Sequence, residues 1–340
     1  MTPKKNLLYI GNKLSKKGNT ITSIETLGSL LEAEGYKIIM VSSVKNKFLR
    51  LLHMLYVTFK NRNKVSNVLI DTYSTQNFYY AVGVGIICRL FKTPYIPILR
   101  GGNLNNRLEN DKIFSVKFFQ GAKTNVVPSK FLMEKFKNKG FENLSYIPNS
   151  LEIDRYSFKT SAIITPKLLW VRSFSEIYNP ILALQIVEIL TVKGVEVSLT
   201  MVGPEKDGSL QQCKKIVDDL NLPVTFTGIL NKNEWINLAK EFDIFINTTN
   251  FDNMPISVME AMALGLPVIS TNVGGLPYLI ENEIDGILVA PNNADGFVNA
   301  IENLCKNPLK TKEITQNARK KVEAFDWQII KHKWNDLLNS

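Results

Sequence analysis

The sequence predicts an α/β protein built from two doubly wound parallel sheets. Short apolar runs of strand length alternate with longer segments of helical periodicity along the whole chain, which is the pattern of successive βαβ units. Polar and irregular sequence from Leu151 to Pro166 interrupts this alternation near the middle of the chain. With 340 residues, the chain is also too long for one ordinary hydrophobic core. We therefore expect two domains whose sheets face one another across a cleft between their carboxyl edges.

In the first half, each predicted strand is an apolar run that ends at a polar or glycine-containing turn. Helices are expected for residues 21–34, ending at Gly35, and for residues 76–91. Ser129 is a suitable N-cap for a third helix that runs to Lys139. The strands are expected at Asn6 to Ile10, Lys37 to Val41, Val65 to Asp71, Tyr95 to Leu99, Asn125 to Pro128 and Ser145 to Ile147.

The second half repeats the same alternation and begins again with a strand at Lys167. Its strands are expected at Lys167 to Val171, Val197 to Val202, Val224 to Thr227, Phe242 to Ile246, Leu266 to Thr271 and Gly286 to Val289. Helices are expected between them at Pro180 to Lys193, Ser209 to Leu220, Asn233 to Ala239, Pro255 to Leu264, from beyond Gly275 to about Glu281, and at Ala294 to Cys305, followed by helical sequence to the end.

The stretch from Phe245 to Gly275 carries the chemistry that the pattern favours most. A buried strand leads through a polar loop into a helix that begins near Pro255 and stops at Gly265, so the loop lies at the carboxyl edge of a parallel sheet, where such folds bind ligands. Free backbone N–H groups at a helix start attract an anion, so a phosphate could sit against the stretch Asn253 to Ser257. Asp252 and Glu260 are eight positions apart, and spacing alone leaves two interpretations open: both face one cleft, or both are solvated surface acids.

Composition narrows the chemical classes. The three cysteines lie far apart and fit no disulfide or metal spacing, which indicates a reducing, cytoplasmic setting. The two histidines are too few for a histidine-based metal site, so we expect no metal. The amino-terminal sequence lacks a signal-peptide cleavage site. The longest apolar run, Ala81 to Cys88, is far shorter than the ~20 residues that a membrane span requires.

Positive charge is concentrated in the first half of the chain. Residues 1–157 carry 24 Lys and Arg against 10 Asp and Glu, whereas residues 158–340 carry 17 against 21. The segment Lys45 to Lys64 has six basic residues, no acid and an apolar face at helical spacing. It suits an interfacial helix on an anionic membrane, and it equally suits a core-facing helix with solvated ends.

Two further features of the first half suggest an anion site. The loop that holds Gly18 and Asn19 follows the first strand, and Arg100 stands at the carboxyl end of a later strand, where it could meet a phosphate or remain a surface cation. The first loop lacks the Gly-x-Gly-x-x-Gly spacing of dinucleotide-binding proteins, which argues against an oxidoreductase.

With these motifs in place, the chain resembles glycosyltransferase family 4, the retaining enzymes of the GT-B fold with two Rossmann-like domains. The resemblance rests on DNMPISVMEAMALGLPVISTNVGGLPYLI, and on the shorter matches VVPSKFL, IPNSLEIDRY, WVRSF, MVGPE and VTFTGIL, so it covers most of the chain. It implies an acceptor-binding domain at 1–157, a nucleotide-sugar-binding domain at 158–322 and a carboxyl-terminal helix at 323–340 that packs back on the first domain.

The resemblance also implies roles for individual residues. Glu260 matches the glutamate that binds the ribose hydroxyls, and Asp252 matches a glutamate near the transferred sugar. Arg172 matches the arginine that binds the diphosphate. The diphosphate and sugar would be held by the backbone of Asn253, Met254, Pro255, Ile256 and Ser257. The base would lie beside Gly228, Ile229 and Leu230, and Gly203 would belong to the same donor site. The diphosphate and the acceptor would be bordered by Gly18, Asn19 and Arg100.

Three departures from the family pattern bear on catalysis. Asp252 is one methylene shorter than the family's glutamate. The lysine that usually follows the diphosphate arginine is absent, because the local sequence is Ile177-Tyr178-Asn179-Pro180. A histidine common on the acceptor side has no counterpart, and Arg100 occupies that region.

The resemblance implies a retaining transfer of a sugar from a nucleoside diphosphate sugar to a hydroxyl of a glycan or lipid-linked acceptor, without a metal, in cell-envelope polysaccharide synthesis. Such an enzyme would be cytoplasmic and peripheral on the inner membrane face, with an anionic membrane surface as a partner of the basic half. Three alternatives stay open: an inactive nucleotide-sugar-binding relative, a nucleic-acid-binding protein, and an epimerase that acts on the same donors. The absence of a nucleic-acid recognition motif counts against the second.

Overall fold

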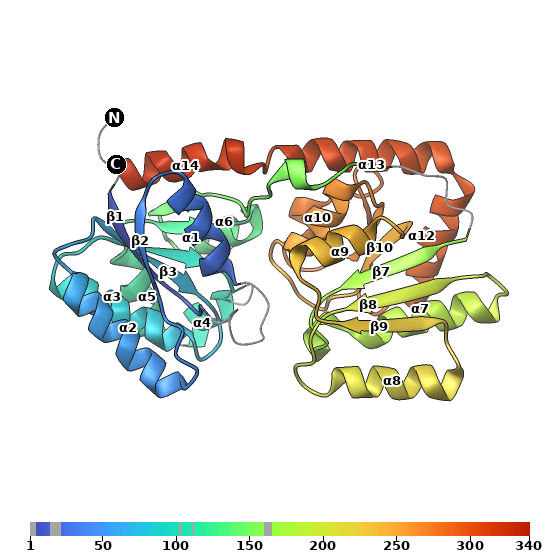
Figure 1. Ribbon diagram of the computed structural model, residues 1–340, viewed down its shortest axis with the longest axis horizontal. Coiled ribbons are helices and arrows are strands. Elements are labelled where there is room, and N and C mark those ends of the chain that lie inside the picture. Colours follow the sequence, from blue (N-terminus) through green and yellow to red (C-terminus); the bar gives the residue numbers. More distant parts are fainter. Residues whose placement is uncertain (1–4, 14–21, 102–103, 111, 160–164) are drawn as a thin grey trace. The chain divides into compact units, whose positions relative to one another are not determined.

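The protein consists of two compact units, each built around a six-stranded parallel sheet (Figure 1). The computed structural model describes residues 5–13, 22–101, 104–110, 112–159 and 165–340. One unit comprises Met1–Pro148 and Ile330–Ser340, and the other comprises Asn149–Ile329. The predicted α/β class with two doubly wound sheets is confirmed. The cleft expected between the two sheets stays a prediction.

The first sheet has the strand order β2-β1-β3-β4-β5-β6, and all neighbouring strands are parallel. The order reverses between β1 and β3, which is the switch point where doubly wound sheets open a crevice. The strands lie close to their predicted positions, at β1 Asn6–Ile10, β2 Lys37–Val41, β3 Asn67–Thr72, β4 Tyr95–Leu99, β5 Asn125–Val127 and β6 Leu144–Tyr146.

Six helices connect these strands. Ser129 caps α6, as predicted, because its hydroxyl accepts a hydrogen bond from the Leu132 N–H. The predicted helix in the basic segment Lys45 to Lys64 is also present and is capped by Asn46. Two helices between residues 104 and 120 were not predicted. The helices are α1 Ser23–Ala33, α2 Lys47–Asn61, α3 Phe78–Leu90, α4 Leu104–Asn110, α5 Lys112–Gln120 and α6 Lys130–Lys137.

The second sheet has the order β12-β11-β10-β7-β8-β9, and its strands are likewise parallel. Because β10 pairs with β7, the polar loop that follows β10 emerges beside the end of β7. The strands are β7 Lys167–Val171, β8 Ser198–Val202, β9 Val224–Gly228, β10 Ile244–Asn247, β11 Val268–Thr271 and β12 Ile287–Val289.

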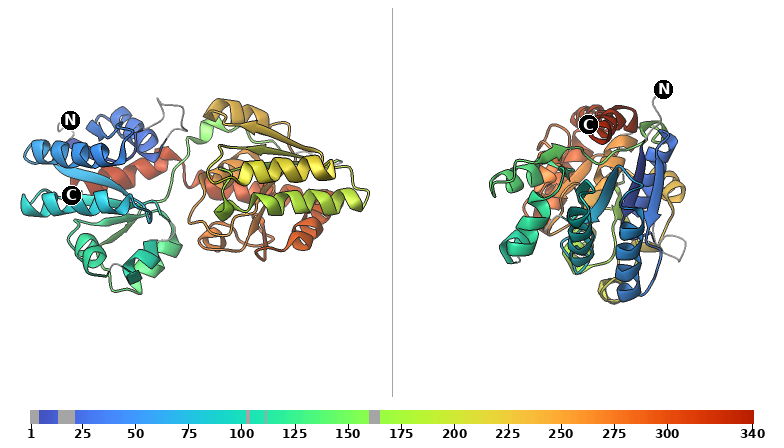
Figure 2. Two further views of the ribbon diagram at one scale, coloured as in Figure 1. Left: turned by 90° about the horizontal axis from the view of Figure 1, so that it is seen from below. Right: turned by 90° about the vertical axis from the view of Figure 1, so that its left-hand side faces the viewer.

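Alternate residues of the central strands fill two separate cores. Leu168 and Trp170 pack on the side of α7, α8 and α12, whereas Leu169 and Phe245 pack on the side of α9, α10 and α13. This alternation follows from the two-residue period of a strand. Figure 2 shows α7 and α8 lying along one face of the sheet. The helices are α7 Pro180–Val192, α8 Ser209–Leu220, α9 Lys232–Ala239, α10 Ile256–Leu264, α11 Leu276–Leu279, α12 Ala294–Lys306, α13 Pro308–Glu323 and α14 Trp327–Asn339.

The division between the units falls at 148/149, nine residues before the predicted boundary at 157/158. Leu151, Ile153 and Tyr156 belong to the second core, so the first part of the predicted linker is packed structure. The last eleven residues, Ile330–Ser340, belong to the first unit. In the described part of the chain, no helix combines the length and the apolar character that crossing a membrane requires.

Candidate functional site

The amino terminus of α10 lies at the carboxyl edge of the second sheet. Pro255 is its N-cap rather than its first helical residue, and Gly265 ends it with the predicted left-handed conformation, at φ 86°. The first N–H groups of a helix have no partner within it. The Ser257 hydroxyl beside them is buried and has no hydrogen-bond partner among the described residues. This end of α10 therefore offers donors to a ligand with negative charge.

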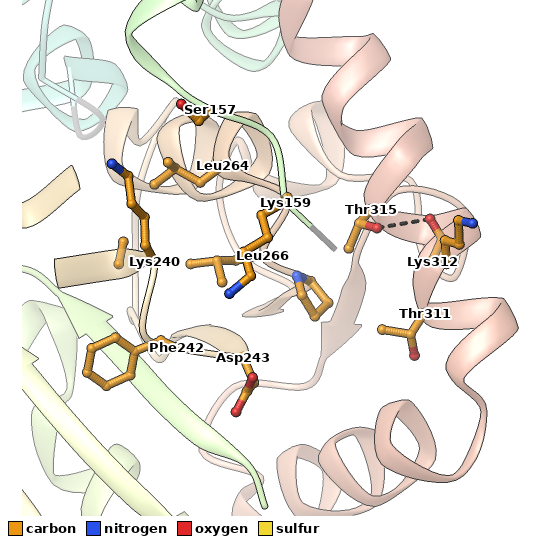
Figure 3. A pocket seen from close by; sticks show the side chains of 13 residues that line it. Ser157, Lys159, Lys240, Phe242, Asp243, Leu264, Leu266, Thr311, Lys312 and Thr315 are labelled. Atoms are coloured by element: carbon orange, nitrogen blue, oxygen red, sulfur yellow. Dashed lines mark hydrogen bonds between the residues drawn. The ribbon is translucent and has the colours of Figure 1, made fainter. Parts of the chain in front are cut away.

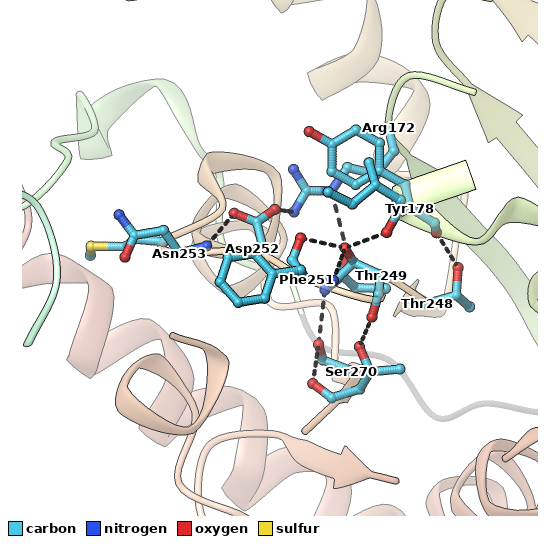
Figure 4. A network of polar contacts seen from close by, with 12 residues as sticks. Arg172, Tyr178, Thr248, Thr249, Phe251, Asp252, Asn253 and Ser270 are labelled. Atoms are coloured by element: carbon cyan, nitrogen blue, oxygen red, sulfur yellow. Dashed lines mark hydrogen bonds and ion pairs between the residues drawn. The ribbon is translucent and has the colours of Figure 1, made fainter. Parts of the chain in front are cut away.

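Asp252, in the loop before α10, forms an ion pair with Arg172, which directly follows β7 (Figure 4). A distance of 2.6 Å separates the Asp252 Oδ2 atom from the Arg172 Nη2 atom, and both side chains are mostly buried. Arg172 Nε also donates to Asn247 Oδ1 at 3.3 Å, and the Tyr178 ring lies 5.0 Å from the guanidinium carbon. The cation that the sequence predicts for a diphosphate is thus held in place by three neighbours and balanced by Asp252.

Threonines anchor the loop between β10 and α10. The indole N–H of Trp170 donates to the Thr248 hydroxyl at 3.0 Å, and that hydroxyl donates to the backbone oxygen of Asn179 at 2.9 Å. Thr271 donates to the backbone oxygen of Thr249 at 2.6 Å. These bonds tie the loop to β7, to the start of α7 and to β11, so the position of Asp252 is fixed by the sheet.

Glycines allow the backbone to pass close to the loop. A Cβ atom on Gly275 would lie 1.8 Å from the backbone oxygen of Asn253, and one on Gly203 would lie 1.7 Å from the backbone oxygen of Arg172. The Gly203 N–H donates to the Gly228 oxygen at 2.9 Å. Arg172, Gly203 and Gly228, which the sequence assigns to one site, are therefore neighbours at the ends of β7, β8 and β9.

Glu260, in the second turn of α10, is 4% exposed, which excludes its interpretation as a solvated surface acid. Its Oε1 atom accepts a hydrogen bond from the Tyr156 hydroxyl at 2.9 Å and is paired with the Lys232 ammonium group. The Lys232 nitrogen also lies 5.6 Å from the centre of the Tyr156 ring. Burial, reinforced by the charge of Arg155, lowers the pKa of Lys232 to about 8.

The remaining predicted donor residues differ in what they expose. Ile229 is 48% exposed just after β9, so its side chain can cover a planar ligand. Leu230 is partly buried against the second core, and Met254 is buried in it. The Met254 backbone oxygen accepts a hydrogen bond from the Asn149 side chain at 3.0 Å. Asn253 is also buried, whereas the Ile256 side chain is partly exposed.

In the first unit, Arg100 is paired with a buried carboxylate that the sequence analysis did not consider. Arg100 Nε lies 3.1 Å from Asp71 Oδ1, which also accepts a hydrogen bond from the Tyr9 hydroxyl at 2.9 Å. Burial raises the pKa of the Asp71 carboxyl, and the Arg100 charge opposes this rise. The three side chains come from the carboxyl ends of β4, β3 and β1. Arg100 is thus a positioned donor group with a balanced charge, not an isolated surface cation.

Two predicted residues, Gly18 and Asn19, lie outside the described residues. Among the residues that the structure does describe, no group of three or more His, Cys, Asp or Glu side chains could hold a metal ion. The expectation that no metal is needed stays a prediction.

Sequence reasoning missed the side chains that surround the predicted carboxylates. Tyr156 and Lys232 contact Glu260 from segments 104 and 28 residues away, and neither belongs to a recognisable local pattern. Tyr178 occupies the segment where the family's lysine is absent and lies against Arg172 instead. No signal short of the strand order could have identified these neighbours.

A separate pocket in the second unit lies away from this site (Figure 3). Its lining includes Lys240, Asp243 and Pro267, and Asp243 and Pro267 immediately precede β10 and β11. The pocket therefore lies at the amino-terminal edge of the sheet, whereas Arg172, Gly203 and Gly228 lie at the carboxyl edge.

Known proteins share both the site sequence and the fold. Residues 158–321 match the family model described as glycosyl transferases group 1. Over 104 residues the chain is 31% identical to the UDP-Gal:alpha-D-GlcNAc-diphosphoundecaprenol alpha-1,3-galactosyltransferase of Escherichia coli. That segment is 31% of this chain and only 27% of the relative, so the likeness to curated proteins is confined to part of their length.

Solved structures resemble the whole chain. The sucrose-phosphate synthase of Thermosynechococcus elongatus has a TM-score of 0.81 at 15% identity, and the comparison covers 99% of this chain and 98% of that one. Anabaena HepE in complex with UDP and glucose has a TM-score of 0.79 at 16% identity, over 99% of this chain and 100% of HepE. The fold is the two-domain GT-B fold of these structures, and residues 158–321, which carry Arg172, Asp252 and Glu260, match the glycosyl transferases group 1 family.

Proposed function

We propose that this protein is a retaining glycosyltransferase that moves a sugar from a nucleoside diphosphate sugar to an acceptor hydroxyl. The observation that carries the proposal is the grouping, within residues 158–321, of the α10 amino terminus, the Arg172–Asp252 pair and the buried Glu260 carboxylate. A phosphate-binding helix end, a fixed cation and a carboxylate for hydroxyl groups are the parts that a nucleotide sugar requires.

The donor would bind along the carboxyl edge of the second sheet. Glu260 would accept hydrogen bonds from the ribose, and the exposed Ile229 with Gly228 and Leu230 would lie beside the base. The N–H groups of Met254, Ile256 and Ser257 would hold the diphosphate and the sugar, while the Asn253 N–H donates to Asp252 Oδ1 at 2.7 Å. Gly203 would leave room at the end of β8. UDP sugars are the first donors to examine, because HepE was solved with UDP-glucose and the Escherichia coli relative is named for UDP-Gal.

The chemistry follows from the charge that develops on the leaving diphosphate. Arg172 and the α10 amino terminus would stabilise that charge, which is the main catalytic task in such a transfer. Asp252 would contact the transferred sugar, and for that contact its ion pair with Arg172 must loosen as the diphosphate arrives. A donor phosphate oxygen would accept the proton of the acceptor hydroxyl. We propose that no metal takes part.

The acceptor would bind to the first unit, near Arg100 and the loop that holds Gly18 and Asn19. We propose that it is a glycan or a lipid-linked precursor of cell-envelope polysaccharide. The Arg100 guanidinium is held by Asp71, so it can donate hydrogen bonds to acceptor oxygens from a fixed position. The enzyme would then work in the cytoplasm, peripheral to the inner face of the membrane.

Helix α2 supports the membrane surface as a partner. Met54 is buried in the first core and Leu51 and Leu55 pack against it, whereas Phe48 is 66% and Tyr56 60% exposed. The other exposed apolar residues of this helix are Leu49, Leu52 and Phe59. Six basic residues and no acid lie between Lys45 and Lys64. An apolar face flanked by cations is the pattern of a helix that lies in an anionic membrane interface.

Vesicle sedimentation tests this partner. The wild type should sediment with vesicles that contain phosphatidylglycerol at low salt, and less at high salt, because screening weakens attraction to the surface. Leu49→Ser/Leu52→Ser should reduce sedimentation, whereas Leu309→Ser, which removes an exposed leucine from the second unit, should not. A wild type that stays in the supernatant at low salt rejects the membrane partner.

A catalytically inactive nucleotide-sugar-binding relative is the second candidate. It is favoured by the pairing of Asp252 with Arg172 and by Tyr178, which lies against Arg172 in the segment where the family has a lysine. Nucleotide release from a UDP sugar without acceptor separates the candidates, because an active transferase hydrolyses its donor slowly.

A thermal-shift panel of nucleoside diphosphate sugars tests the proposal first. A true donor at 100 times its Kd should raise the free energy of unfolding by roughly 2.7 kcal/mol. The stabilising donor is then incubated with lipid-linked acceptors, and the anomeric configuration of the product is read by NMR. Inversion at the anomeric carbon, or no stabilisation by any donor, contradicts the proposed function.

A further inference from the structure

Two contacts on one oxygen atom distinguish the proposed ribose carboxylate of this chain. The Tyr156 hydroxyl donates to Glu260 Oε1, and the Lys232 ammonium group is paired with the same atom. No described residue forms a hydrogen bond to Oε2. Glu260 therefore has one oxygen saturated by the protein and one available for a ligand, and this asymmetry is built before any nucleotide binds.

The surrounding backbone holds both contacts rigidly. Lys232 is the first residue of α9, whose N-cap Asn231 accepts hydrogen bonds from the N–H groups of Asn233 and Glu234 at 3.0 and 3.1 Å. Glu234 returns a bond by accepting from the Asn231 N–H at 2.7 Å, which completes a capping box. Lys232 thus starts from a fixed point beside the loop that follows β9.

Tyr156 is held from two sides. Its backbone oxygen accepts a hydrogen bond from Arg319 Nη1 at 2.7 Å, which connects it to α13. The preceding residue, Arg155, donates to Asn233 Oδ1 at 2.8 Å and pairs with Glu152 at 3.0 Å. The segment before Tyr156 and the start of α9 are therefore joined by a side-chain bond, and both deliver their groups to the same Glu260 oxygen.

Burial explains why Glu260 needs these partners. A carboxylate that is 4% exposed and lacks a cation has its pKa raised by loss of solvation, by several units when burial is complete. A protonated carboxyl group is a weaker acceptor for ribose hydroxyls than a carboxylate. The charged groups around Glu260 are Lys232 on α9, Arg155 and Glu152 before β7, and Arg319 on α13, and of these Lys232 is the one in contact with the carboxylate.

We propose that Lys232 and Tyr156 are positioning residues of the donor site, which keep Glu260 ionised and occupy Oε1 so that Oε2 alone receives the ribose. This inference rests on the proposed function and assigns two residues that the resemblance does not. Tyr156 orients the carboxylate, and Lys232 supplies the counter-ion.

The test is the affinity for a nucleoside diphosphate measured against pH. UDP, GDP and ADP are titrated by calorimetry, and the one that the wild type binds most tightly is used from pH 5.5 to pH 7, where Lys232 is charged because its pKa is about 8. The quantity compared is the Kd of each variant divided by the wild-type Kd at the same pH, because this ratio cancels the titration of the nucleotide phosphates.

Lys232→Met should bind more weakly than the wild type by a ratio that grows as pH falls. In this variant the buried carboxyl group lacks a cation and is expected to protonate, so binding would require the loss of one proton. The ratio should then approach a tenfold increase for each unit by which the pH falls. Lys232→Arg keeps the positive charge, so its Kd divided by the wild-type Kd should be small and independent of pH. Tyr156→Phe, which keeps the cation, should weaken binding severalfold at every pH.

Lys240→Met is the matched control, because Lys240 is at the other end of α9 and lines the separate pocket. Its ratio should stay near one. If Lys232→Met does not fold, the other two variants still decide: a Tyr156→Phe ratio near one, or a Lys232→Arg ratio that changes with pH, overturns the proposal. A Lys232→Met ratio that is near one, or large but constant with pH, overturns the proposal. A wild type that binds no nucleoside diphosphate overturns the proposed function itself.

Discussion

Replacing Gly275 by alanine should displace the loop that carries Asp252 and Asn253. The new Cβ atom would lie 1.8 Å from the Asn253 backbone oxygen, and such atoms essentially never approach within 3.0 Å, so the two must separate by about 1.2 Å. Gly275 has a φ of −88°, which alanine adopts freely, so the clash alone is tested. The atom it meets belongs to the backbone, and no side-chain rotation can relieve the contact.

This displacement reaches the ion pair of Asp252 and Arg172, which we propose to be catalytic. The Gly275 N–H donates to the Asp252 backbone oxygen at 2.9 Å, and Asp252 lies 2.6 Å from Arg172. A misplacement of about 1 Å at a reacting group costs on the order of 100-fold in rate. We therefore expect Gly275→Ala to lower kcat/KM for donor turnover about 100-fold, equivalent to about 2.7 kcal/mol of transition-state stabilisation.

The assay is nucleotide release from the donor that the thermal-shift panel identifies. Gly194→Ala is the control: Gly194 has a φ of +77° and nothing within 4 Å of the added Cβ, so alanine strains the backbone there without displacing the loop. Its stability should fall by about 1–2 kcal/mol while kcat/KM stays at the wild-type value. The reasoning is refuted if Gly275→Ala keeps kcat/KM within threefold of the wild type.

Three further outcomes are expected. Asp71→Asn should lower the melting temperature of the first unit by roughly 6–20 °C in calorimetry, because removing one partner of a buried ion pair costs about 3–5 kcal/mol. Glu142→Gln, at an exposed site, should leave the melting temperature unchanged, and an equal effect of the two substitutions contradicts the account. Arg172→Lys should lower donor turnover at least tenfold in the nucleotide-release assay, since lysine cannot contact Asp252, Asn247 and the Tyr178 ring together. A variant that turns over the donor at the wild-type rate would be incompatible with this geometry. Treatment with EDTA should leave donor turnover unchanged, and a loss that Mg²⁺ or Mn²⁺ restores would show that a metal takes part.

The order of strands and helices was largely predictable, because it depends on local periodicity. The buried run before Asn247 and the glycine stop at Gly265 were predicted from the sequence and confirmed. The helices between residues 104 and 120 were missed, since this stretch carries mixed polar and aromatic residues without a clear apolar stripe.

The partners of the site residues were not predictable, because they depend on which strands become neighbours. Arg172 meets Asp252 because β7 pairs with β10, and a sequence does not state that pairing. Lys232 reaches Glu260 because α9 and α10 pack on the same face of the second sheet. The sequence analysis therefore identified the carboxylates and left their counter-ions unassigned.

Helix α2 shows a different limit. The sequence left two interpretations open, a membrane helix or a core helix, and the structure contains features of both. Leu51 and Leu55 face the core while Phe48 and Tyr56 face solvent. The apolar stripe of α2 is wider than the part of the helix that contacts the core. Hydrophobic periodicity predicts the stripe, but it does not say how much of the stripe the core covers.

In the proposed donor site, the second unit binds a nucleoside diphosphate sugar through Glu260. Calorimetric titration of UDP-glucose and UDP-galactose into the wild type and into Glu260→Gln measures what this carboxylate contributes to donor binding. Hydrogen bonds to a charged group contribute about 1.5–3 kcal/mol, so the variant should bind the preferred donor roughly 10- to 150-fold more weakly. Equal affinity of the two proteins for that donor would contradict the account.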